Sequence, residues 1–353
     1  MNIKNEQYES SEAFISYMQQ TASNVLDSLI PDNAEIILLD YPNTTNVGDS
    51  LIWLGEIAYL KKRGLKITYV CDTRNYDFKK VKEKINQNSI VLMHGGGNFG
   101  TVWHEIHTFR LRVINDLVGV PIIQLPQTIH FDNQDKINEI NQALTKHGKF
   151  TLIVRSQHCY DFAKEKFKTD VYLSPDMAFF IGAIKSEHKP SIDCLAIART
   201  DHETSGALMS VLKNLQSECA LRITDWLGAS VAERLTHRVE VNTIVIRSIF
   251  DADNTLLIYL WNFLSGLRLN RGVSLICNAH VVITDRLHVH ILSILLGKPH
   301  VIVDNNYGKL KHFYETWSYR CTLHAYAAEP SEISSKLKEL MGASLNEKTI
   351  ETY

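Results

Sequence analysis

Residues 281–304 read VVITDRLHVHILSILLGKPHVIVD, and this stretch decides the expected fold. The apolar residues 281–283 predict a buried strand, and the apolar run at 291–296 predicts a helix that the following Gly-Lys-Pro sequence ends. A second β-branched run at 301–303 predicts another strand. The order strand, turn, helix and strand is typical of a βαβ unit, so the chain is expected to be an α/β protein.

The first turn of this βαβ unit carries Asp285, Arg286 and His288. In open α/β sheets, ligands bind at the carboxyl ends of the strands, so these three side chains are candidates for a functional site. The alternative interpretation is that Thr284 or Asp285 caps the helix and that the Arg and the His have no chemical task. Spacing alone leaves both interpretations open.

The composition is that of an ordinary globular protein. The chain has 353 residues, which favours about two domains, and it is 45% hydrophobic and 22% charged. A formal net charge of −2 gives no electrostatic reason to expect a nucleic acid partner. The six cysteines are scattered without close pairing, which argues against a disulfide framework and favours a reducing compartment.

Neither a signal peptide nor a membrane span is expected from the sequence. The N-terminal residues are polar and acidic, unlike a secretory leader. No apolar run approaches the roughly 20 residues that cross a bilayer. The protein is therefore expected in the cytoplasm, with peripheral docking on a membrane face left open.

Polar residues follow one expected strand after another in the first half of the chain. Such repetition is typical of a doubly wound parallel sheet whose site lies along one edge. The expected strands are at residues 35–40, 65–70, 89–93, 121–125, 150–154 and 170–173.

The turn after the third of these strands reads HGGGNFG. Gly95, Gly96 and Gly97, followed by Asn98, leave backbone N–H groups unshielded, which suits an anion. The turn matches neither a Walker A sequence nor GxGxxG. The alternative is that these glycines serve only tight packing of the loop against the sheet.

The turn after the first strand contains Gly48, Asp49 and Ser50. Gly48 permits close approach of the backbone, which favours a turn that faces a ligand. The structural alternative is that Asp49 or Ser50 caps the helix expected at 51–62.

A charged, proline-containing segment at 184–191 is the expected linker between two domains. Further strands are expected after it at 194–198, 223–226, 240–246, 281–284 and 301–303. The expected division is therefore an N-terminal domain (1–183), a linker (184–191), a C-terminal domain (192–330), and a C-terminal helix and tail (331–353). Within the last segment, a helix at 330–343 is expected to precede a mobile tail.

An ordered set of motifs resembles the polysaccharide pyruvyl transferases. The motifs are NVGD at 46–49, HGGGNFG at 94–100, LPQTIHF at 125–131, VRSQHCYDFA at 154–163, SPDMAFF at 174–180 and TDRLHVHILSILLGKP at 284–299. They extend in order over residues 36–318. The resemblance implies two Rossmann-like domains that face each other across a cleft, as in GT-B glycosyltransferases, with the acceptor on the N-terminal side and the donor on the C-terminal side.

The implied reaction transfers pyruvate from phosphoenolpyruvate (PEP) onto two hydroxyls of one sugar, as a cyclic ketal, and releases phosphate. The implied acceptor is a glycan under assembly for an exopolysaccharide, a capsule or another cell-surface polysaccharide. Such a glycan is often lipid-linked at the inner face of the cytoplasmic membrane. PEP is thus a co-substrate, and no cofactor is expected.

The resemblance assigns PEP binding to Arg286, Leu287 and His288, and to a second arginine for which Arg155 is the first choice. Arg199 is a less certain contributor. Guanidinium groups suit PEP because they bind carboxylate and phosphate with two parallel hydrogen bonds.

Two side chains are candidates for proton transfer. His288 is expected to be either the proton donor to the PEP methylene carbon or only a phosphate ligand. Asp49 is the leading candidate for the base that takes the proton of the sugar hydroxyl. His94 and His130 are candidates either for lining the acceptor site or for packing only, and Gln127, Asn98 and Asp176 are candidates for hydrogen bonds to sugar hydroxyls. Trp103 and Trp317 are candidates for stacking on a sugar, with simple burial as the alternative.

No metal-binding motif appears in the sequence, so metal-independent chemistry is expected. Two other functions stay open. One is a GT-B glycosyltransferase that uses a nucleotide sugar, since arginines and glycine turns also suit a diphosphate. The other is a glycan-binding or assembly protein without catalysis.

Overall fold

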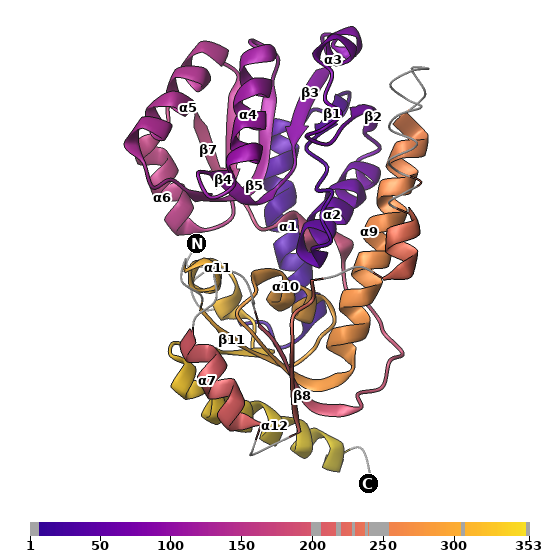
Figure 1. Cartoon of the computed structure of the whole chain (residues 1–353), viewed down its shortest axis with the longest axis vertical. Helices are drawn as coiled ribbons and strands as arrows, with labels where there is room; N and C mark the ends of the chain where they lie inside the picture. The colour runs from indigo at the N-terminus through magenta and orange to yellow at the C-terminus, as the bar shows by residue number, and fades with distance from the viewer. Residues whose placement is uncertain are drawn as a thin grey trace. The chain divides into compact units, whose positions relative to one another are not determined.

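The computed structural model describes residues 7–198, 206–216, 220–227, 230–236, 239, 254–304 and 308–350, without the side chains of 206–207 and 342–350. The chain divides into two compact units. The larger unit consists of Gln19–Phe180 and Gly228–Arg268, and the smaller one of Met1–Met18, Ile181–Leu227 and Leu269–Tyr353. Each unit contains its own parallel β-sheet (Figure 1).

The strands of the larger unit are β1 Glu35–Leu39, β2 Lys66–Val70, β3 Ser89–Met93, β4 Gly96–Gly100, β5 Ile122–His130, β6 Phe150–Val154 and β7 Asp170–Leu173. They form a seven-stranded sheet in the order β2-β1-β3-β5-β6-β7, and β4 pairs with β5. All of these pairs are parallel. The chain leaves β1 toward β2 on one side, whereas β3 lies on the other. The strand order therefore reverses between β1 and β3, where open sheets bind ligands.

Both faces of this sheet are buried, which explains why its strands are continuous apolar runs. Ile37 and Leu39 of β1 belong to one hydrophobic cluster and Ile36 and Leu38 to another, because successive side chains point to opposite faces. The first cluster contains residues of α3 Phe78–Lys84, α4 His104–Asp116, α5 Gln134–His147 and α6 Gln157–Lys166. The second contains residues of α1 Ser11–Leu29, α2 Val47–Lys62, α9 Asn254–Cys277 and the 3₁₀ helix η1 Met177–Ile181.

The strands of the smaller unit are β8 Ile192–Ile197, β9 Leu221–Thr224, β10 Ala279–Thr284, β11 His300–Val303 and β12 His324–Ala327. They form a five-stranded parallel sheet in the order β12-β11-β10-β8-β9, so here the order reverses between β8 and β10. The helices are α7 Gly206–Leu215, α10 Leu287–Leu295, α11 Lys309–Thr316 and α12 Ile333–Ile350, with the 3₁₀ helices η2 Ser318–Arg320 and η3 Pro330–Glu332. Side chains of α7 and α12 pack on one face of the sheet.

The structure confirms a mixed α/β fold with parallel sheets, and most expected strands are present. Every strand of the first sheet precedes the expected linker at 184–191, and every strand of the second follows it. Three expectations need correction: β4 and β12 were not predicted, and residues 344–350 extend α12 instead of forming a tail. The strand expected at 240–246 lies outside the described residues. The arrangement of the two units across a cleft stays a prediction.

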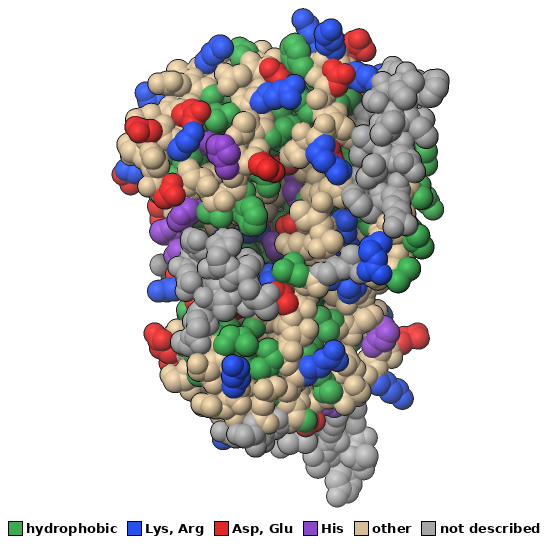
Figure 2. Space-filling view, in the orientation of Figure 1, with side chains coloured by type: hydrophobic (Ala, Val, Ile, Leu, Met, Phe, Trp, Pro, Cys, Tyr) green, Lys and Arg blue, Asp and Glu red, His purple; other side chains and the backbone are tan. Residues whose placement is uncertain are grey.

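No helix within the described ranges is long and apolar enough to cross a membrane. Large apolar side chains are nevertheless exposed along α9. Leu256, Tyr259 and Phe263 are between 50% and 66% exposed, and Figure 2 shows hydrophobic side chains along the edge of the molecule that carries α9.

Candidate active site

The turn between β10 and α10 places Arg286 at the point where the strand order of the smaller sheet reverses. Arg286 stands immediately before α10, and its backbone N–H donates to Thr284 Oγ1 at 3.0 Å. Thr284 itself donates to the carbonyl of Ile197, the last residue of β8. The hydroxyl thus ties the turn to the neighbouring strand and fixes the direction in which the arginine leaves the backbone.

The guanidinium of Arg286 is buried but only partly paired. Its Nη2 donates to Asp225 Oδ2 at 2.7 Å, and the residue is 5% exposed. Its Nε–H is buried and has no hydrogen-bond partner among the described residues. A buried donor without a partner costs about 1–3 kcal/mol, and more when it belongs to a charged group. The position therefore favours an incoming acceptor atom.

The start of α10 adds to this preference for an anion. No side chain of the described residues caps the helix at Arg286, so the positive end of the helix dipole favours an anion at the first turn. Leu287 is buried and His288 is half-buried in the same turn. Arg286, Leu287 and His288 therefore combine a guanidinium, an apolar wall and an imidazole at one helix start.

One predicted donor-site residue, Arg199, follows β8 and lies outside the described residues.

In the larger unit, a buried polar network occupies the point where the strand order reverses between β1 and β3. Asp40 directly follows β1, adopts a left-handed backbone conformation with φ 71°, and is buried. Arg110 of α4 donates from Nη2 to Asp40 Oδ2 at 2.9 Å and to Asn98 Oδ1 at 2.7 Å. Burial raises the pKa of Asp40 above its ordinary value, although Arg110 opposes the shift.

His94, the residue after β3, forms a buried pair with Glu56 of α2. Nδ1 of His94 lies 2.9 Å from Glu56 Oε2, and both side chains are 1% exposed. Burial acts to lower the pKa of His94, but the carboxylate of Glu56, with smaller contributions from Asp40 and Asp49, raises the pKa above its ordinary value. Nε2 of His94 is buried without a partner in the described part of the chain.

The glycine turn forms β4, and its N–H groups are less available than the sequence indicated. The Gly95 N–H donates to Glu56 Oε1 at 2.9 Å, and the Asn98 N–H donates to Gln127 Oε1 at 3.1 Å. The expectation that these two amides face a ligand is wrong, because protein acceptors already hold them. Gly97 instead permits close packing, since an added Cβ would lie 2.9 Å from Arg155 Nη2.

Arg155, the residue after β6, is a buried member of an ion pair. Its Nη1 donates to Asp176 Oδ2 at 2.6 Å and its Nε donates to Thr128 Oγ1 at 2.8 Å. Asp176 was expected to meet sugar hydroxyls, but this carboxylate pairs with the arginine. Gln127 is likewise engaged, because its amide donates to the His94 carbonyl at 2.9 Å.

Asp49 lies in the first turn of α2, but it does not cap the helix. Asn46 is the cap, and its side chain accepts from the Gly48 N–H at 3.0 Å. Asp49 is half-buried and accepts from Thr44 Oγ1 at 2.8 Å. The capping interpretation of Asp49 and Ser50 is therefore wrong. The Asp49 carboxylate instead accepts the hydrogen bond from Thr44, in a turn next to the His94 network.

The sequence missed the partners that hold these groups in place: Asp40, Glu56, Arg110 and Asp225. Glu56 had one usable signal, because it is the acidic residue inside the otherwise apolar run LIWLGEIAYL of α2. Asp225 had no such signal in the sequence, because it contacts Arg286, which lies 61 residues later in the chain.

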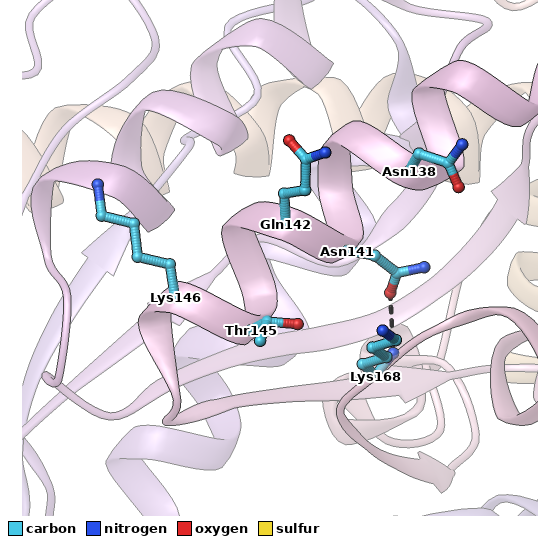
Figure 3. A pocket seen from close by; sticks show the side chains of 6 residues that line it. All are labelled: Asn138, Asn141, Gln142, Thr145, Lys146 and Lys168. Atoms are coloured by element: carbon cyan, nitrogen blue, oxygen red, sulfur yellow. Dashed lines mark hydrogen bonds between the residues drawn. The ribbon is translucent and has the colours of Figure 1, made fainter.

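An open surface hollow of about 580 Å³ lies along the outer side of α5 (Figure 3). The figure shows amide and lysine side chains around it, with Asn141 accepting from the Lys168 backbone N–H at 2.9 Å. None of the predicted site residues lines it. This hollow is therefore no part of the candidate site.

Comparison with known proteins identifies the family. The family model described as polysaccharide pyruvyl transferase matches residues 46–307. A protein of Bacillus subtilis (strain 168), named "Putative pyruvyl transferase EpsO", is 32% identical over 314 residues, which cover 88% of this chain and 92% of that protein. "Pyruvyl transferase 1" of Schizosaccharomyces pombe is 29% identical over 324 residues, 87% of this chain and 75% of that protein.

A solved structure supports the fold. The crystal structure of a functionally uncharacterised protein from Klebsiella pneumoniae matches with a TM-score of 0.57 and 22% identity, covering 88% of this chain and 98% of that one. The match of the family model, which includes the glycine turn, Arg155 and the Arg286–His288 turn, is the stronger finding. The chain belongs to the polysaccharide pyruvyl transferase family.

Proposed function

We propose that this chain transfers pyruvate from PEP onto two hydroxyls of one sugar, forming a cyclic ketal and releasing inorganic phosphate. The observation that carries the proposal is the buried Nε–H of Arg286, which has no partner among the described residues and stands at an uncapped helix start. PEP carries a carboxylate and a phosphate, and both groups accept charge-assisted hydrogen bonds from such a site.

The reaction requires one proton to be delivered and two to be removed. A proton adds to the methylene carbon of PEP and leaves an oxocarbenium-like centre at C2. One sugar hydroxyl attacks C2 and loses its proton, and the bond from C2 to the phosphate oxygen breaks. The second hydroxyl then closes the ring, and its proton goes to the released phosphate. Electrostatic stabilisation of the departing phosphate is the contribution expected of Arg286.

In this proposal, His288 delivers the proton to the methylene carbon or binds the phosphate, and Asp49 takes a proton from a sugar hydroxyl. Arg155 is the second arginine at PEP. Asp225 is a positioning residue, because it holds one edge of the Arg286 guanidinium at 2.7 Å. The two-domain GT-B-like arrangement is part of the same proposal, since the two arginines proposed to bind PEP, Arg155 and Arg286, belong to different units.

The proposed acceptor is the sugar of a cell-surface or exopolysaccharide repeat unit that is lipid-linked during assembly. A cytoplasmic enzyme with peripheral contact to the inner membrane face would reach such an acceptor. The family membership supports a glycan acceptor, and the PEP donor, the lipid link and the membrane contact are proposals.

The test is an incubation of the purified chain with PEP and a panel of hexoside acceptors. We expect phosphate release that depends on the acceptor, and a product whose mass equals acceptor plus pyruvate less water. A parallel incubation with nucleotide sugars tests a glycosyltransferase. Release of nucleoside diphosphate there, with PEP left unchanged in the first incubation, would refute the proposal.

A further inference from the structure

Three buried histidines meet in the smaller unit: His290 of α10, His300 at the start of β11 and His324 at the start of β12. One ring nitrogen from each lies within 4.8 Å of the others. The closest pair is Nδ1 of His290 and Nε2 of His300, at 2.7 Å. Residues far apart in the sequence thus bring three potential ligand atoms together.

The outward nitrogens of two of these rings have partners of the kind that surround metal sites. Nδ1 of His300 lies 2.7 Å from the Lys298 carbonyl, which can only accept, so this nitrogen carries a proton and Nε2 offers a lone pair. Nε2 of His290 lies 2.9 Å from Ser318 Oγ. Metal-binding histidines usually donate their second N–H to a carbonyl or another acceptor, which fixes the ring.

The third ring is the one that apolar packing does not explain. Both nitrogens of His324 are buried without a hydrogen-bond partner among the described residues. Each such group costs about 1–3 kcal/mol, so a histidine is a poor choice for this position unless something binds it. Its ring stacks on His300 with centroids 5.2 Å apart, and one of its nitrogens lies within 4.8 Å of a ring nitrogen of each of the other two histidines.

The cluster consists of histidines alone among the described residues, without a carboxylate, which suits an ion that prefers nitrogen ligands.

We propose that His290, His300 and His324 bind one divalent ion of the zinc class. Zn–N bonds of about 2.0–2.1 Å in a tetrahedron separate the nitrogens by roughly 3.3 Å, so the His290–His300 pair opens by about 0.6 Å as the ion takes the place of the shared proton. That proton moves to Nε2 of His290, which then donates to Ser318 Oγ. A water molecule completes the tetrahedron. No short-range sequence motif predicts this site, because its ligands are separated by 10 and 24 residues.

The ion would have a structural effect on the donor turn. His290 lies in the helix that starts at Arg286, and the other two ligands lie on adjacent strands. Binding would therefore clamp α10 to β11 and β12. The inference does not depend on the proposed reaction, since metal binding can be measured without substrate.

The test uses the full chain without an affinity tag, stripped with a chelator and titrated with Co²⁺. We expect one equivalent to bind, with the visible absorption of tetrahedral cobalt, displacement by Zn²⁺ and a rise in Tm. Ser318→Ala, which removes an outer partner, should weaken binding by about 10–100-fold. His324→Ala should abolish it, whereas His280→Ala, an exposed histidine of β10, should leave it unchanged.

Absence of Co²⁺ and Zn²⁺ binding to the stripped, folded wild-type chain would overturn the proposal, and the cluster would then be a packed group of histidines only. Undiminished binding in His324→Ala would also overturn it. If His324→Ala does not fold, Ser318→Ala and the cobalt spectrum of the wild-type chain decide the question.

Discussion

The substitution Arg286→Lys tests the proposed donor site most directly. Lysine keeps the positive charge and can still reach a carboxylate such as Asp225, but it lacks a donor at the position of Nε. The buried Nε–H of Arg286 has no partner among the described residues, so its loss costs the folded protein little. If that N–H binds PEP, its loss should lower kcat/KM for PEP and leave the stability of the fold almost unchanged.

The expected magnitude is that of one charge-assisted hydrogen bond. Such a bond contributes about 1.5–3 kcal/mol, which corresponds to a loss of roughly 10–150-fold in kcat/KM for PEP. The replacement also removes the planar guanidinium, which can form two parallel hydrogen bonds, so the loss in kcat/KM is expected toward the upper end of this range. The KM for the acceptor should change little.

The assay is phosphate release at varied PEP and saturating acceptor. Arg222→Lys is the matched control, because Arg222 is an exposed arginine of β9 in the same unit. Circular dichroism and Tm establish that the variant is folded. A folded Arg286→Lys protein with the PEP kinetics of the wild type would refute the assignment of Arg286 to the donor.

Three further substitutions test the larger unit. Glu56→Gln removes the charge that raises the pKa of His94. The wild-type pair stabilises the fold fully below the ordinary pKa of 6.5, and this stabilisation decreases as the pH rises through the folded-state pKa. The variant should therefore lose about 1.5–3 kcal/mol of the free energy of unfolding at acid pH and less at basic pH, as measured by urea unfolding. Equal losses at all pH values would contradict this. Gly55→Ala should lower the free energy of unfolding by about 1–3 kcal/mol or more, because an added Cβ would overlap a backbone carbonyl. Gly266→Ala, where nothing lies within 4 Å of an added Cβ, should leave the free energy of unfolding unchanged or raise it. Arg155→Lys should raise the KM for PEP; a lower Tm with unchanged KM would make Arg155 a structural residue only.

Most of the fold was predictable because buried parallel strands leave a strong local signal. The runs of β1, β3 and β6 are apolar on both faces and end in polar turns, so their positions follow from the sequence alone. The strands that were missed lack that signal. β4 is composed largely of glycine, and β12 is four residues long with histidine and tyrosine among them.

The candidate site was predictable only in part, because its key groups depend on partners from distant segments. The sequence indicated Arg286 from its place after a strand, and the family resemblance indicated Arg155. It could not show that Asp225 holds one of them or that Asp176 holds the other, since both contacts are tertiary. The same limit explains why the N–H of Gly95 was expected to face a ligand: its acceptor, Glu56, lies 39 residues earlier.

The two strand-order reversals are built alike, because each has a buried arginine paired with a carboxylate. Arg110 uses both Nη groups within the protein, on Asp40, the His94 carbonyl and Asn98, so it fastens the glycine turn to β1. Among the described residues, Arg286 has one carboxylate partner, Asp225. A buried guanidinium with no counterion would be too costly. The Nε–H groups of Arg110 and Arg286 are both buried without a partner in the described part of the chain, so this feature alone does not distinguish the two arginines. Asp225 holds one edge of Arg286 and compensates its charge, which makes it as necessary to the proposed donor site as the arginine it holds.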